Sequence, residues 1–332
     1  MKAIIPVAGM GSRLRPHTHT QPKPLIPVAG KPILGHIIDN LLAAGIDELV
    51  FIIGYLRDKI QQYVVQEYAE QRHFEFVVQE PRKGLAHALW VAKDTYADCE
   101  EILIVLGDTI FGSDVQKVLR MEGAILGVHE VDDPREFGIA VIDHKENLIT
   151  KVVEKPMIPT SNNALVGLYR LTDISLFVDT LGKMMEKPLP PNGEYHITDA
   201  FTEMIAQGVN FRPYRVENWF DCGRKQSLLA TNQILLERIE EFESYEFEGT
   251  VIIHPVQIAP GCDISGSIIG PYVALAENVT IRGSIVSNSI LGAYSSLNSI
   301  ILANSVIGND TSLRGKSTIV NIGDNTEIDF DE

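Results

Sequence analysis

A segment rich in glycine and basic residues follows the first apolar run of the chain. Residues 9–25, called the basic loop below, read GMGSRLRPHTHTQPKPL and include Gly9, Gly11, Arg13 and Lys23. Glycines let backbone N–H groups approach a phosphate closely, and arginine and lysine side chains add charge-assisted hydrogen bonds. The segment lacks the GxxxxGK pattern of a P-loop and the third glycine of a Rossmann fingerprint. The sequence therefore indicates a phosphate-binding turn of another kind.

The charge distribution supports an anion site near the N-terminus. The formal net charge is −16, yet residues 1–38 contain no Asp or Glu and have five Lys or Arg residues. An acidic protein that keeps one segment free of carboxylates is expected to bind an anion there. The same net charge disfavours nucleic acid and anionic membranes as partners. We interpret His17 and His19, which lie in this segment, as polar turn residues.

Two aspartates occupy turns where a hard cation could bind. Asp108 follows the apolar run Ile102–Leu106 and Gly107, and Asp221 lies in the sequence WFDCG. Carboxylates from distant segments suit a divalent cation that also binds phosphate oxygens. A lone aspartate after a strand is more often a helix cap. The metal role therefore depends on the further motifs described below.

The first two thirds of the chain alternate strand-like and helical segments. Short apolar runs predict buried strands over Ala3–Ala8, Leu49–Ile53, Phe74–Gln79 and Ile102–Leu106. Apolar residues at helical spacing predict helices over Pro32–Ala44, Asp58–Ala69 and Leu85–Lys93. This alternation favours an α/β fold with a Rossmann-like, mixed but mostly parallel sheet and helices on both faces. Ligands of such sheets bind beyond the carboxyl ends of the strands, so we expect chemistry after Ala8, Gln79 and Leu106.

The C-terminal part of the chain has a different composition. Residues 250–328 contain neither Phe nor Trp, and aliphatic residues recur there at intervals of six. The residues expected to face inward are Ile252, Ile258, Ile264, Ile269, Leu275, Ile281, Leu291, Leu297, Ile301, Ile307, Leu313, Ile319, Ile322 and Ile328. This period is typical of a left-handed parallel β-helix with three six-residue units per coil, which gives about four coils. A β-sandwich is the alternative, but it would show alternation with a period of two and more aromatic residues.

Taken together, the motifs resemble those of the sugar-1-phosphate nucleotidyltransferases. This family includes glucose-1-phosphate thymidylyltransferases, glucose-1-phosphate uridylyltransferases and mannose-1-phosphate guanylyltransferases. The basic loop is similar to the family pattern GxGSRLxPxT followed by PKPL. Further matches follow in family order: QEPRKGLA at 79–86, LGD at 106–108, FG at 137–138, EKP at 154–156, EYHITD at 194–199 and WFDCG at 219–223. The resemblance covers about residues 1–230.

The resemblance implies a role for each candidate residue. Arg13 would grip the β- and γ-phosphates of a nucleoside triphosphate, Lys23 would bridge the α-phosphate and the sugar phosphate, and Lys155 would bind the sugar phosphate. The other implied residues are Ala8, Gly9, Gly11, Gln79 and Gly84 for the nucleotide, Gly138, Glu154 and Gly167 for the sugar, and Asp108 and Asp221 for Mg²⁺. The sugar phosphate is itself the nucleophile, so positioning and charge neutralisation are expected to dominate catalysis.

The sequence defines the substrates less narrowly than it defines the reaction. The spacing from Gln79 to Gly84-Leu-Ala resembles pyrimidine-using members and favours dTTP or UTP. The hexapeptide tail resembles the long form of glucose-1-phosphate thymidylyltransferase, whereas Pro22-Lys23-Pro24-Leu25 is closer to mannose-1-phosphate guanylyltransferases. A uridylyltransferase and a guanylyltransferase therefore stay open as alternatives. So does a regulatory nucleotide-sugar-binding subunit, although Arg13, Lys23, Asp108, Lys155 and Asp221 are all present. An acyltransferase β-helix is disfavoured, because the only histidine there is His254.

These observations lead to an overall organisation. We expect a catalytic domain over residues 1–235, an acidic connector over 236–249 and a β-helix domain over 250–332. Residues 228–248 are predicted to form a helix that ends in the acidic segment Glu237–Glu248. No apolar run approaches the ~20 residues of a membrane span. The three cysteines are far apart and favour reduced thiols in a cytoplasmic protein. We expect a homo-oligomer, in which the β-helix either stacks against another subunit or caps the catalytic domain.

Overall fold

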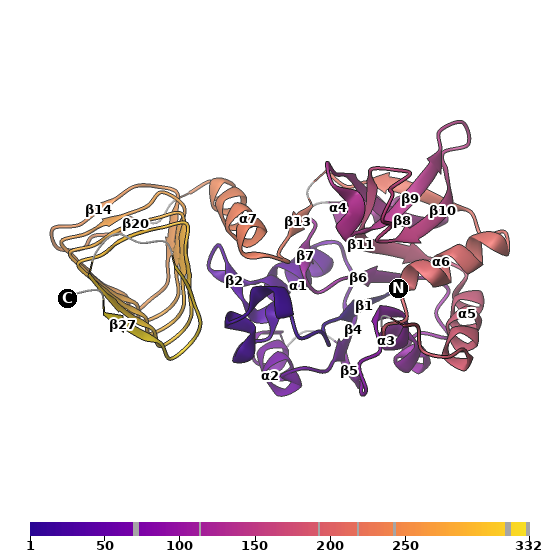
Figure 1. Cartoon of the computed structure of the whole chain (residues 1–332), viewed down its shortest axis with the longest axis horizontal. Helices are drawn as coiled ribbons and strands as arrows, with labels where there is room; N and C mark the ends of the chain where they lie inside the picture. The colour runs from indigo at the N-terminus through magenta and orange to yellow at the C-terminus, as the bar shows by residue number, and fades with distance from the viewer. Residues whose placement is uncertain are drawn as a thin grey trace. The chain divides into compact units, whose positions relative to one another are not determined.

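The computed structural model describes residues 1–68, 73–112, 114–191, 193–217, 219–241, 244–315 and 320–329. It divides into two compact units, whose elements are labelled in Figure 1. The first unit comprises Met1–Gly9 and His36–Trp219, and the second comprises Met10–Gly35 and Phe220–Glu332. All of the basic loop except Gly9 therefore belongs to the second unit.

The first unit contains a nine-stranded sheet. Seven strands follow the order β10-β9-β11-β6-β1-β4-β5, β8 branches from β11, and β12 pairs with β8. The strands are β1 Lys2–Pro6, β4 Glu48–Ile53, β5 His73–Val78, β6 Ile102–Val105, β8 Ala124–Glu130, β9 Gly138–Asp143, β10 Leu148–Glu154, β11 Asn163–Leu171 and β12 Phe211–Arg215. β1 pairs in parallel with β4 and β6, and β4 pairs in parallel with β5. β11 is antiparallel to β6, β8 and β9. The structure thus confirms the predicted mixed, Rossmann-like sheet.

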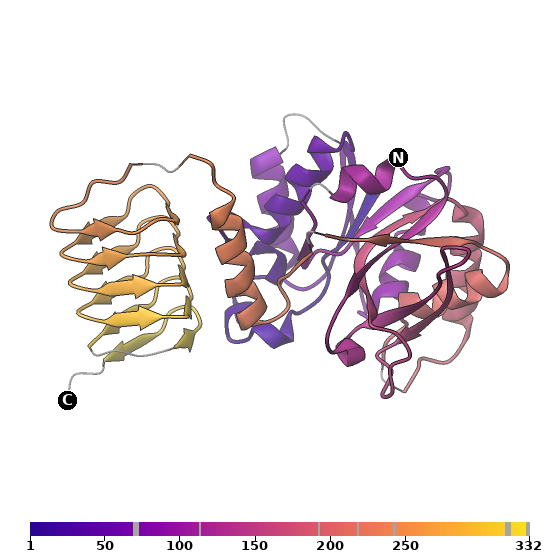
Figure 2. The same ribbon diagram turned by 90° about the horizontal axis from the view of Figure 1, so that it is seen from above.

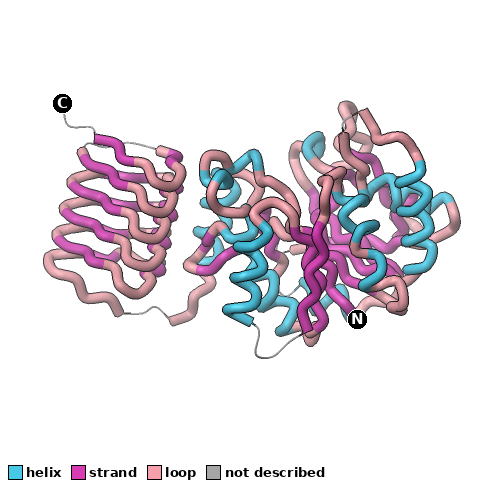
Figure 3. The backbone as a smooth tube through the Cα atoms, turned by 90° about the horizontal axis from the view of Figure 1, so that it is seen from below, coloured by secondary structure: helices cyan, strands magenta, loops and turns pink. Residues whose placement is uncertain are grey.

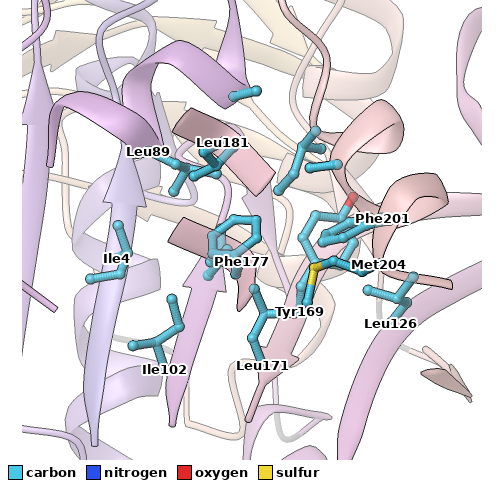
Figure 4. Packing of buried hydrophobic residues seen from close by; sticks show 14 of the residues in the cluster. Ile4, Leu89, Ile102, Leu126, Tyr169, Leu171, Phe177, Leu181, Phe201 and Met204 are labelled. Atoms are coloured by element: carbon cyan, nitrogen blue, oxygen red, sulfur yellow. The ribbon is translucent and has the colours of Figure 1, made fainter. Parts of the chain in front are cut away.

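Both faces of the parallel strands are buried. On one face Ile4, Ile102 and Ile104 pack against α3 (Leu85–Val91), α5 (Ile174–Glu186) and α6 (Ile197–Ala206), as Figure 4 shows for part of this core. The alternate residues Ala3 and Ile5 are also fully buried, and they point to the other face because side chains alternate along a strand. Burial on both faces explains why these strands are continuous apolar runs.

The covering helices owe their position to an apolar stripe. In α5 the buried residues include Ile174, Phe177 and Leu181, with the three- and four-residue spacing that places side chains on one side of a helix. In α6 Ile197, Ala200, Phe201 and Met204 repeat the pattern. The buried residues of these two helices pack against the part of the sheet that contains β10 and β11.

Two helices among the remaining elements correspond to predicted segments. The other helices and short strands are α1 Ile33–Ala43, α2 Arg57–Tyr68, α4 Asp114–Leu119, β2 Pro27–Val28, β3 Lys31–Pro32 and β7 Thr109–Ile110. α1 ends before Gly45, whose φ of +86° suits glycine after a helix. The predicted helix over 58–69 corresponds to α2, and its last residue, Ala69, lies outside the described residues. Among the described ranges, no helix has both the length and the apolar character needed to cross a membrane.

The second unit contains a parallel β-helix with the three-sided coils of the left-handed type. Figure 1 looks along its axis at a triangular outline, and Figures 2 and 3 show the coils stacked one on another. Its three sheets are β14-β17-β20-β23, β15-β18-β21-β24-β26 and β16-β19-β22-β25-β27. The strands are β14 Val251–Ile252, β15 Val256–Ile258, β16 Asp263–Ser265, β17 Ile268–Ile269, β18 Val273–Leu275, β19 Thr280–Arg282, β20 Ile285–Ser287, β21 Ser289–Leu291, β22 Ser296–Asn298, β23 Ile301–Ala303, β24 Val306–Ile307, β25 Ser312–Arg314, β26 Asn321–Ile322 and β27 Glu327–Asp329.

The interior of the coils confirms most of the six-residue pattern. Ile258, Leu275, Leu291, Ile307 and Ile322 pair in register on successive coils and line the core. Their numbers show coils of 17, 16, 16 and 15 residues. The coils are therefore shorter than the 18 residues of three full six-residue units, because some corners take fewer residues.

The prediction that Ile301 faces inward is wrong. Ile301 is 49% exposed, whereas the next residue, Leu302, is fully buried and pairs with Val286. The shortened corner before β23 moves the inward position on by one residue, and a shift of one residue turns a strand side chain to the opposite face. Ile319, which was also predicted to face inward, lies outside the described residues.

The predicted helix over 228–248 is also corrected. Helix α7 covers Lys225–Glu237, and Arg238 is its C-cap. Glu240 and Glu241 follow directly. Carboxylates are unfavourable at the negative end of a helix dipole and when they lie three or four residues from one another. These charges therefore explain why α7 ends where the acidic run begins. The short strand β13, Phe220–Asp221, precedes α7.

Candidate functional site

The carboxyl end of β1 begins the candidate site of the first unit. The Val7 N–H donates to the Ile52 carbonyl oxygen at 2.8 Å, and the Ala8 carbonyl oxygen accepts from the Tyr55 N–H at 3.1 Å. Ala8 is 4% exposed. Gly9 has open space on the side where a Cβ would stand. The backbone is therefore fixed as far as Ala8 and becomes accessible at Gly9.

Asp108 lies at the same edge of the sheet, after the neighbouring parallel strand β6. A Cβ on Gly107 would lie 2.3 Å from Cγ1 of Val7, so only glycine permits this close approach. The turn leaves Asp108 half-buried, and the Thr109 hydroxyl donates to its Oδ1 at 3.3 Å. The sequence LGD thus places a carboxylate beside the end of β1, as expected from the parallel order of the strands.

Gly167 supports this turn from strand β11. The Leu106 N–H donates to the Gly167 carbonyl oxygen at 2.9 Å, and the Gly167 N–H donates to the Tyr169 hydroxyl at 3.1 Å. Gly167 has a φ of +89°, and its Cβ would lie 2.7 Å from Cγ of Leu106. Burial raises the pKa of Tyr169, so its hydroxyl stays protonated. The predicted sugar residue Gly167, on β11, therefore supports the turn that contains the predicted metal ligand Asp108.

Gln79 and Gly84 form a second group at the carboxyl end of β5. The Gln79 side chain is 5% exposed, and its amide nitrogen lies 2.9 Å from the Gly84 carbonyl oxygen and 3.1 Å from His87 Nδ1. Gly84 has a φ of +93°, and its Cβ would lie 2.6 Å from the Tyr195 carbonyl oxygen. Both residues thus have a local role. The Gln79 side chain holds the turn at Gly84, and only glycine fits at position 84 because the Tyr195 backbone lies so close.

Glu154 is the centre of a third group, on the hairpin of β9 and β10. Glu154 pairs in register with Gly138, and a Cβ on Gly138 would lie 3.2 Å from Glu154 Oε2 and 2.8 Å from Cγ2 of Thr198. The buried Thr198 hydroxyl donates to Glu154 Oε2 at 3.1 Å, and His196 Nδ1 lies 3.8 Å from Oε1. Glycine at 138 therefore leaves room for a fixed carboxylate.

Lys155 follows Glu154 with an unusual backbone. Its φ is +36°. Residues other than Gly, Asn and Asp seldom adopt this backbone conformation, and it is often retained at functional sites. The Lys155 N–H donates to the Phe137 carbonyl oxygen at 3.0 Å, which holds this conformation. The Lys155 ammonium lies 3.6 Å from Glu154 Oε1 and is about half exposed. A cation and a hydrogen-bonded carboxylate thus stand side by side at the end of β10.

The basic loop lies in the second unit and contains three short 3₁₀ turns. Gly11 has a φ of +62°, and its carbonyl oxygen accepts from the Leu14 N–H at 2.9 Å and the Thr18 hydroxyl at 3.0 Å. A Cβ on Gly11 would lie 2.8 Å from Cβ of Lys23. Arg13 is exposed in the turn Ser12–Leu14, and Lys23 is half-buried at the start of the turn Lys23–Leu25. The loop thus packs its own backbone against Lys23, and Arg13 is exposed.

Asp221 also belongs to the second unit. Its Oδ1 accepts from the Gly223 N–H at 2.9 Å, and a Cβ on Gly223 would lie 2.8 Å from that oxygen. The Thr231 hydroxyl of α7 donates to the Asp221 carbonyl oxygen at 3.4 Å. The side chain is half-buried. Gly223 therefore lets the chain fold back over the carboxylate and fix its orientation.

The carboxylates of Asp108, in the first unit, and Asp221, in the second, are each of a type that suits a hard divalent cation. Asp108 and Asp221 each present an oriented, half-buried carboxylate. Within the described ranges, no group of three or more His, Cys, Asp or Glu side chains is gathered as a metal site. A cation held by one or two carboxylates takes its other ligands from water and phosphate oxygens, which is the usual manner of Mg²⁺.

Sequence reasoning did not assign the residues that brace these groups. Thr198 and His196 lie in the quoted EYHITD motif, but they received no role, and Tyr169 and His87 lie outside every motif that was given a role. The one available signal was position: Thr198 stands in the first turn of α6, directly after the motif's loop. Its contact with Glu154 spans 44 residues of sequence and has no local pattern.

Comparison with known proteins identifies the family of this chain. The model of the nucleotidyl transferase family matches residues 2–238. The chain belongs to this family. The match contains all three groups of the first unit, the basic loop, Asp221 and α7.

Individual relatives extend beyond the family match. The low-salt glycan biosynthesis nucleotidyltransferase Agl11 of Haloferax volcanii is 33% identical over 330 residues, which covers 90% of this chain and 89% of that protein. The glucose-1-phosphate thymidylyltransferase of Streptomyces antibioticus is 30% identical over 327 residues and covers the same shares. A solved Bacillus anthracis structure, described as a candidate glucose-1-phosphate thymidylyltransferase in complex with a sucrose, has 29% identity and a TM-score of 0.62. It covers 74% of this chain and 98% of its own.

Proposed function

We propose that this protein transfers a nucleotidyl group from dTTP or UTP to a sugar-1-phosphate, with glucose-1-phosphate as the favoured acceptor, and releases pyrophosphate. The observation that carries the proposal is the fixed pair of Glu154 and Lys155 at the end of β10. A carboxylate that accepts hydrogen bonds beside an ammonium suits sugar hydroxyls next to a phosphate. Membership of the nucleotidyl transferase family supplies the reaction type.

The residues divide the work of bringing two polyanions together. Lys155 binds the sugar phosphate, and Glu154, Gly138 and Gly167 line the hexose. Arg13 holds the β- and γ-phosphates, and Lys23 bridges the α-phosphate and the sugar phosphate. An oxygen of the sugar phosphate then attacks the α-phosphorus, the bond between the α-phosphorus and the bridging oxygen breaks, and pyrophosphate leaves with that electron pair. No side-chain nucleophile is needed, so the catalytic effect comes from positioning and charge neutralisation.

We propose that Asp108 and Asp221 hold the Mg²⁺ ion of this reaction. When bound, Mg²⁺ would neutralise charge on the phosphate oxygens. The two carboxylates are of the right chemical type, and each is oriented by its own turn. The residues assigned to the nucleotide are Ala8, Gly9, Gly11, Gln79 and Gly84. Backbone groups near Gly9 and the Gln79–Gly84 turn would face the base and the sugar of the nucleotide.

The nucleotide preference rests on resemblance. A thymidylyltransferase is supported by the Streptomyces antibioticus relative, which matches over 90% of this chain. The sequence Pro22-Lys23-Pro24-Leu25 favours the guanylyltransferase alternative instead. UTP also stays open, because it shares with dTTP the ring edge that an amide such as Gln79 recognises.

The test is pyrophosphate release with Mg²⁺. The assay crosses dTTP, UTP, GTP, CTP and ATP with glucose-, mannose-, galactose- and N-acetylglucosamine-1-phosphate. Strong release with dTTP or UTP and glucose-1-phosphate supports the proposal. Release only with GTP and mannose-1-phosphate would replace it with the guanylyltransferase alternative. No release from folded protein that still binds a nucleotide sugar would point to a regulatory subunit.

We further propose a cytoplasmic homo-oligomer in which residues 1–235 form the catalytic domain, 236–249 a connector and 250–332 the β-helix domain.

An exposed aliphatic column on the first β-helix sheet supports self-association: Val251, Ile268, Ile285 and Ile301 pair in register. Three of them are at least 40% exposed, and the column has no charge in a chain of net charge −16. Light scattering of Ile285→Asp beside the unaltered chain tests it, and a monomer in both would refute the oligomer. Partners other than the two substrates, nucleic acid and membranes included, are not expected.

A further inference from the structure

The last coil of the β-helix contacts the basic loop within the second unit. His17 is 7% exposed, and its Nε2 lies 2.5 Å from Asn321 Oδ1. The Thr20 hydroxyl donates to the Asp324 carboxylate. His17 was expected to be a polar turn residue, and it does lie in the turn His17–His19. Its burial shows that the turn is covered by another part of the chain.

Close packing adds to these two hydrogen bonds. A Cβ on Gly323 would lie 3.0 Å from Cβ of Pro16 and 3.2 Å from its Cγ. Glycine is therefore used at 323 to let the coil approach the loop. The Asp324 side chain is also anchored behind the contact, because its Oδ1 accepts from the Asn309 N–H of the preceding coil at 2.7 Å. We call Asn321, Gly323 and Asp324 the terminal clasp.

The segment that follows the basic loop is held by α7 and the first coils. The buried Asn232 of α7 accepts from the Ala29 N–H at 2.8 Å and donates to the Tyr272 carbonyl oxygen at 3.2 Å. A Cβ on Gly30 would lie 2.3 Å from the Gln257 side chain. Gln257 lies in β15 and Asn321 in β26, the first and last described strands of one sheet. That sheet therefore braces the segment 16–30 at both ends.

The clasp is connected to the proposed triphosphate-binding residues by a short path. Thr18 follows His17, and its hydroxyl donates to the Gly11 carbonyl oxygen at 3.0 Å. Gly11 in turn packs against the Lys23 stem, and its carbonyl oxygen closes the turn that carries Arg13. A loop ordered before binding loses less conformational entropy when the ligand arrives. Fixing His17 and Thr20 therefore fixes the geometry of Arg13 and Lys23.

We propose that Asn321 and Asp324 are positioning residues for nucleotide binding, acting through His17 and Thr20 to preorganise the basic loop. The inference rests on the proposed function for its kinetic readout. The β-helix then serves as a structural part of the nucleotide site, in addition to any role in assembly. Burial lowers the pKa of His17, which agrees with a neutral ring that donates its Nε2–H to Asn321.

The kinetic test uses the double variant Asn321→Ala with Asp324→Ala in the full chain. Because two hydrogen bonds to the loop are lost, kcat/KM for the nucleotide should fall about tenfold, mainly through KM. KM for the sugar phosphate should change less, by no more than about threefold, because all of its residues except Lys23 lie in the first unit. Asn321→Asp keeps an acceptor for the His17 N–H and should retain most of the nucleotide affinity. Asn298→Ala removes an exposed asparagine of β22 and serves as the matched control.

A second readout does not depend on activity. Trypsin cleaves after Arg13, which is exposed, but the next residue, Leu14, is 2% exposed. Cleavage there requires the loop to open, so the double variant should be cut several-fold faster than Asn298→Ala. Unchanged cleavage and unchanged nucleotide KM would overturn the positioning role. Equal losses for both substrates with a lowered melting temperature would also overturn it, because they indicate general destabilisation. If no substrate pair is turned over, the function fails, and faster cleavage alone still supports the clasp.

Discussion

Glu154 in the first unit and His17 in the second are both held by side-chain partners, but these partners come from very different distances along the chain. Thr198, which holds Glu154, lies 44 residues away, and Gln79 is joined to Gly84 across only five. Asn321, which holds His17, lies 304 residues away. The residues that hold the groups of the first unit thus lie in the part of the chain that the family's motifs span. The basic loop depends on a domain that the motif series does not include.

This difference predicts which substrate each substitution should affect. Apart from Lys23, which bridges both substrates, all residues assigned to the sugar phosphate lie in the first unit, whereas Arg13 and Lys23 lie in the second. Changes to the braces of Glu154 should therefore affect mainly the sugar phosphate, and changes to the terminal clasp should affect mainly the nucleotide. The predictions below test this separation, starting with a residue whose loss should affect both substrates.

The largest effect is expected from Asp108→Asn. The amide preserves the shape of the side chain but removes the charge of a proposed metal ligand, so kcat should fall by about a hundredfold to a thousandfold or more. The fold should remain intact, because Asp108 is half-buried in a turn defined by Gly107. Pyrophosphate release over a range of Mg²⁺ concentrations measures the loss, and thermal melting checks the fold. An active variant with ordinary Mg²⁺ dependence would remove Asp108 from the metal site.

Lys155→Ala should produce the next largest change. Removal of the ammonium beside Glu154 should raise KM for the sugar-1-phosphate about tenfold and leave KM for the nucleotide nearly unchanged. Lys151→Ala is the matched control, because Lys151 is an exposed lysine of the same strand, β10. Initial rates with each substrate varied in turn would measure both constants. Unchanged sugar-phosphate kinetics would exclude Lys155 from the site.

The sequence predicted the framework of the first unit because its signal is local. The apolar run Leu49–Ile53 corresponds to β4, and the helical spacing over Leu85–Lys93 corresponds to α3. The glycines of LGD and FG were found by their motifs, although the atoms that require them, on Val7 and Thr198, became visible only in the folded chain. The antiparallel position of β11 between β6, β9 and β8 had no sequence signal.

The β-helix shows the same limit in a different form. The repeat was evident, but Ile301 was placed inward because a corner was shorter than the period. The contact between His17 and Asn321 joins a turn to a coil through space. No periodicity or spacing within either segment indicates the other. Such contacts follow from how the whole chain packs, and a single sequence contains no direct record of them.

Thr198→Val should have a smaller effect on the sugar side. Valine keeps the methyl group that packs against Gly138 and removes only the hydroxyl that donates to Glu154. Loss of one hydrogen bond should lower kcat/KM for the sugar-1-phosphate about fivefold. Thr202→Val is the control, because its hydroxyl donates to the Val152 and Thr198 carbonyl oxygens. Equal effects of the two variants would show that Thr198 acts on α6 in general and does not specifically orient Glu154.

The smallest predicted effect is a pH dependence of stability in the second unit. Burial lowers the pKa of His17, a trend that Lys225 reinforces and that Asn321 and Asp324 oppose. Between the lowered folded pKa and the ordinary value near 6.5, the unfolded chain binds a proton that the folded chain excludes. His17 therefore contributes stability above about pH 6.5, and this contribution is lost as the pH falls through the folded pKa.

His17→Gln isolates that contribution, since glutamine can still donate to Asn321 but does not titrate. The other histidines are common to both proteins, so the difference between their unfolding curves reports His17 alone. Denaturant unfolding at pH 7.5 and 5.5 should show a shallower loss of stability in the variant, by at most about 1.4 kcal/mol per pH unit. The rate of tryptic cleavage after Arg13 should rise at pH 5.5 in the unaltered chain and less in the variant. Identical pH dependence in both proteins would mean that the ring is solvated, and that the coil does not cover the turn of the basic loop.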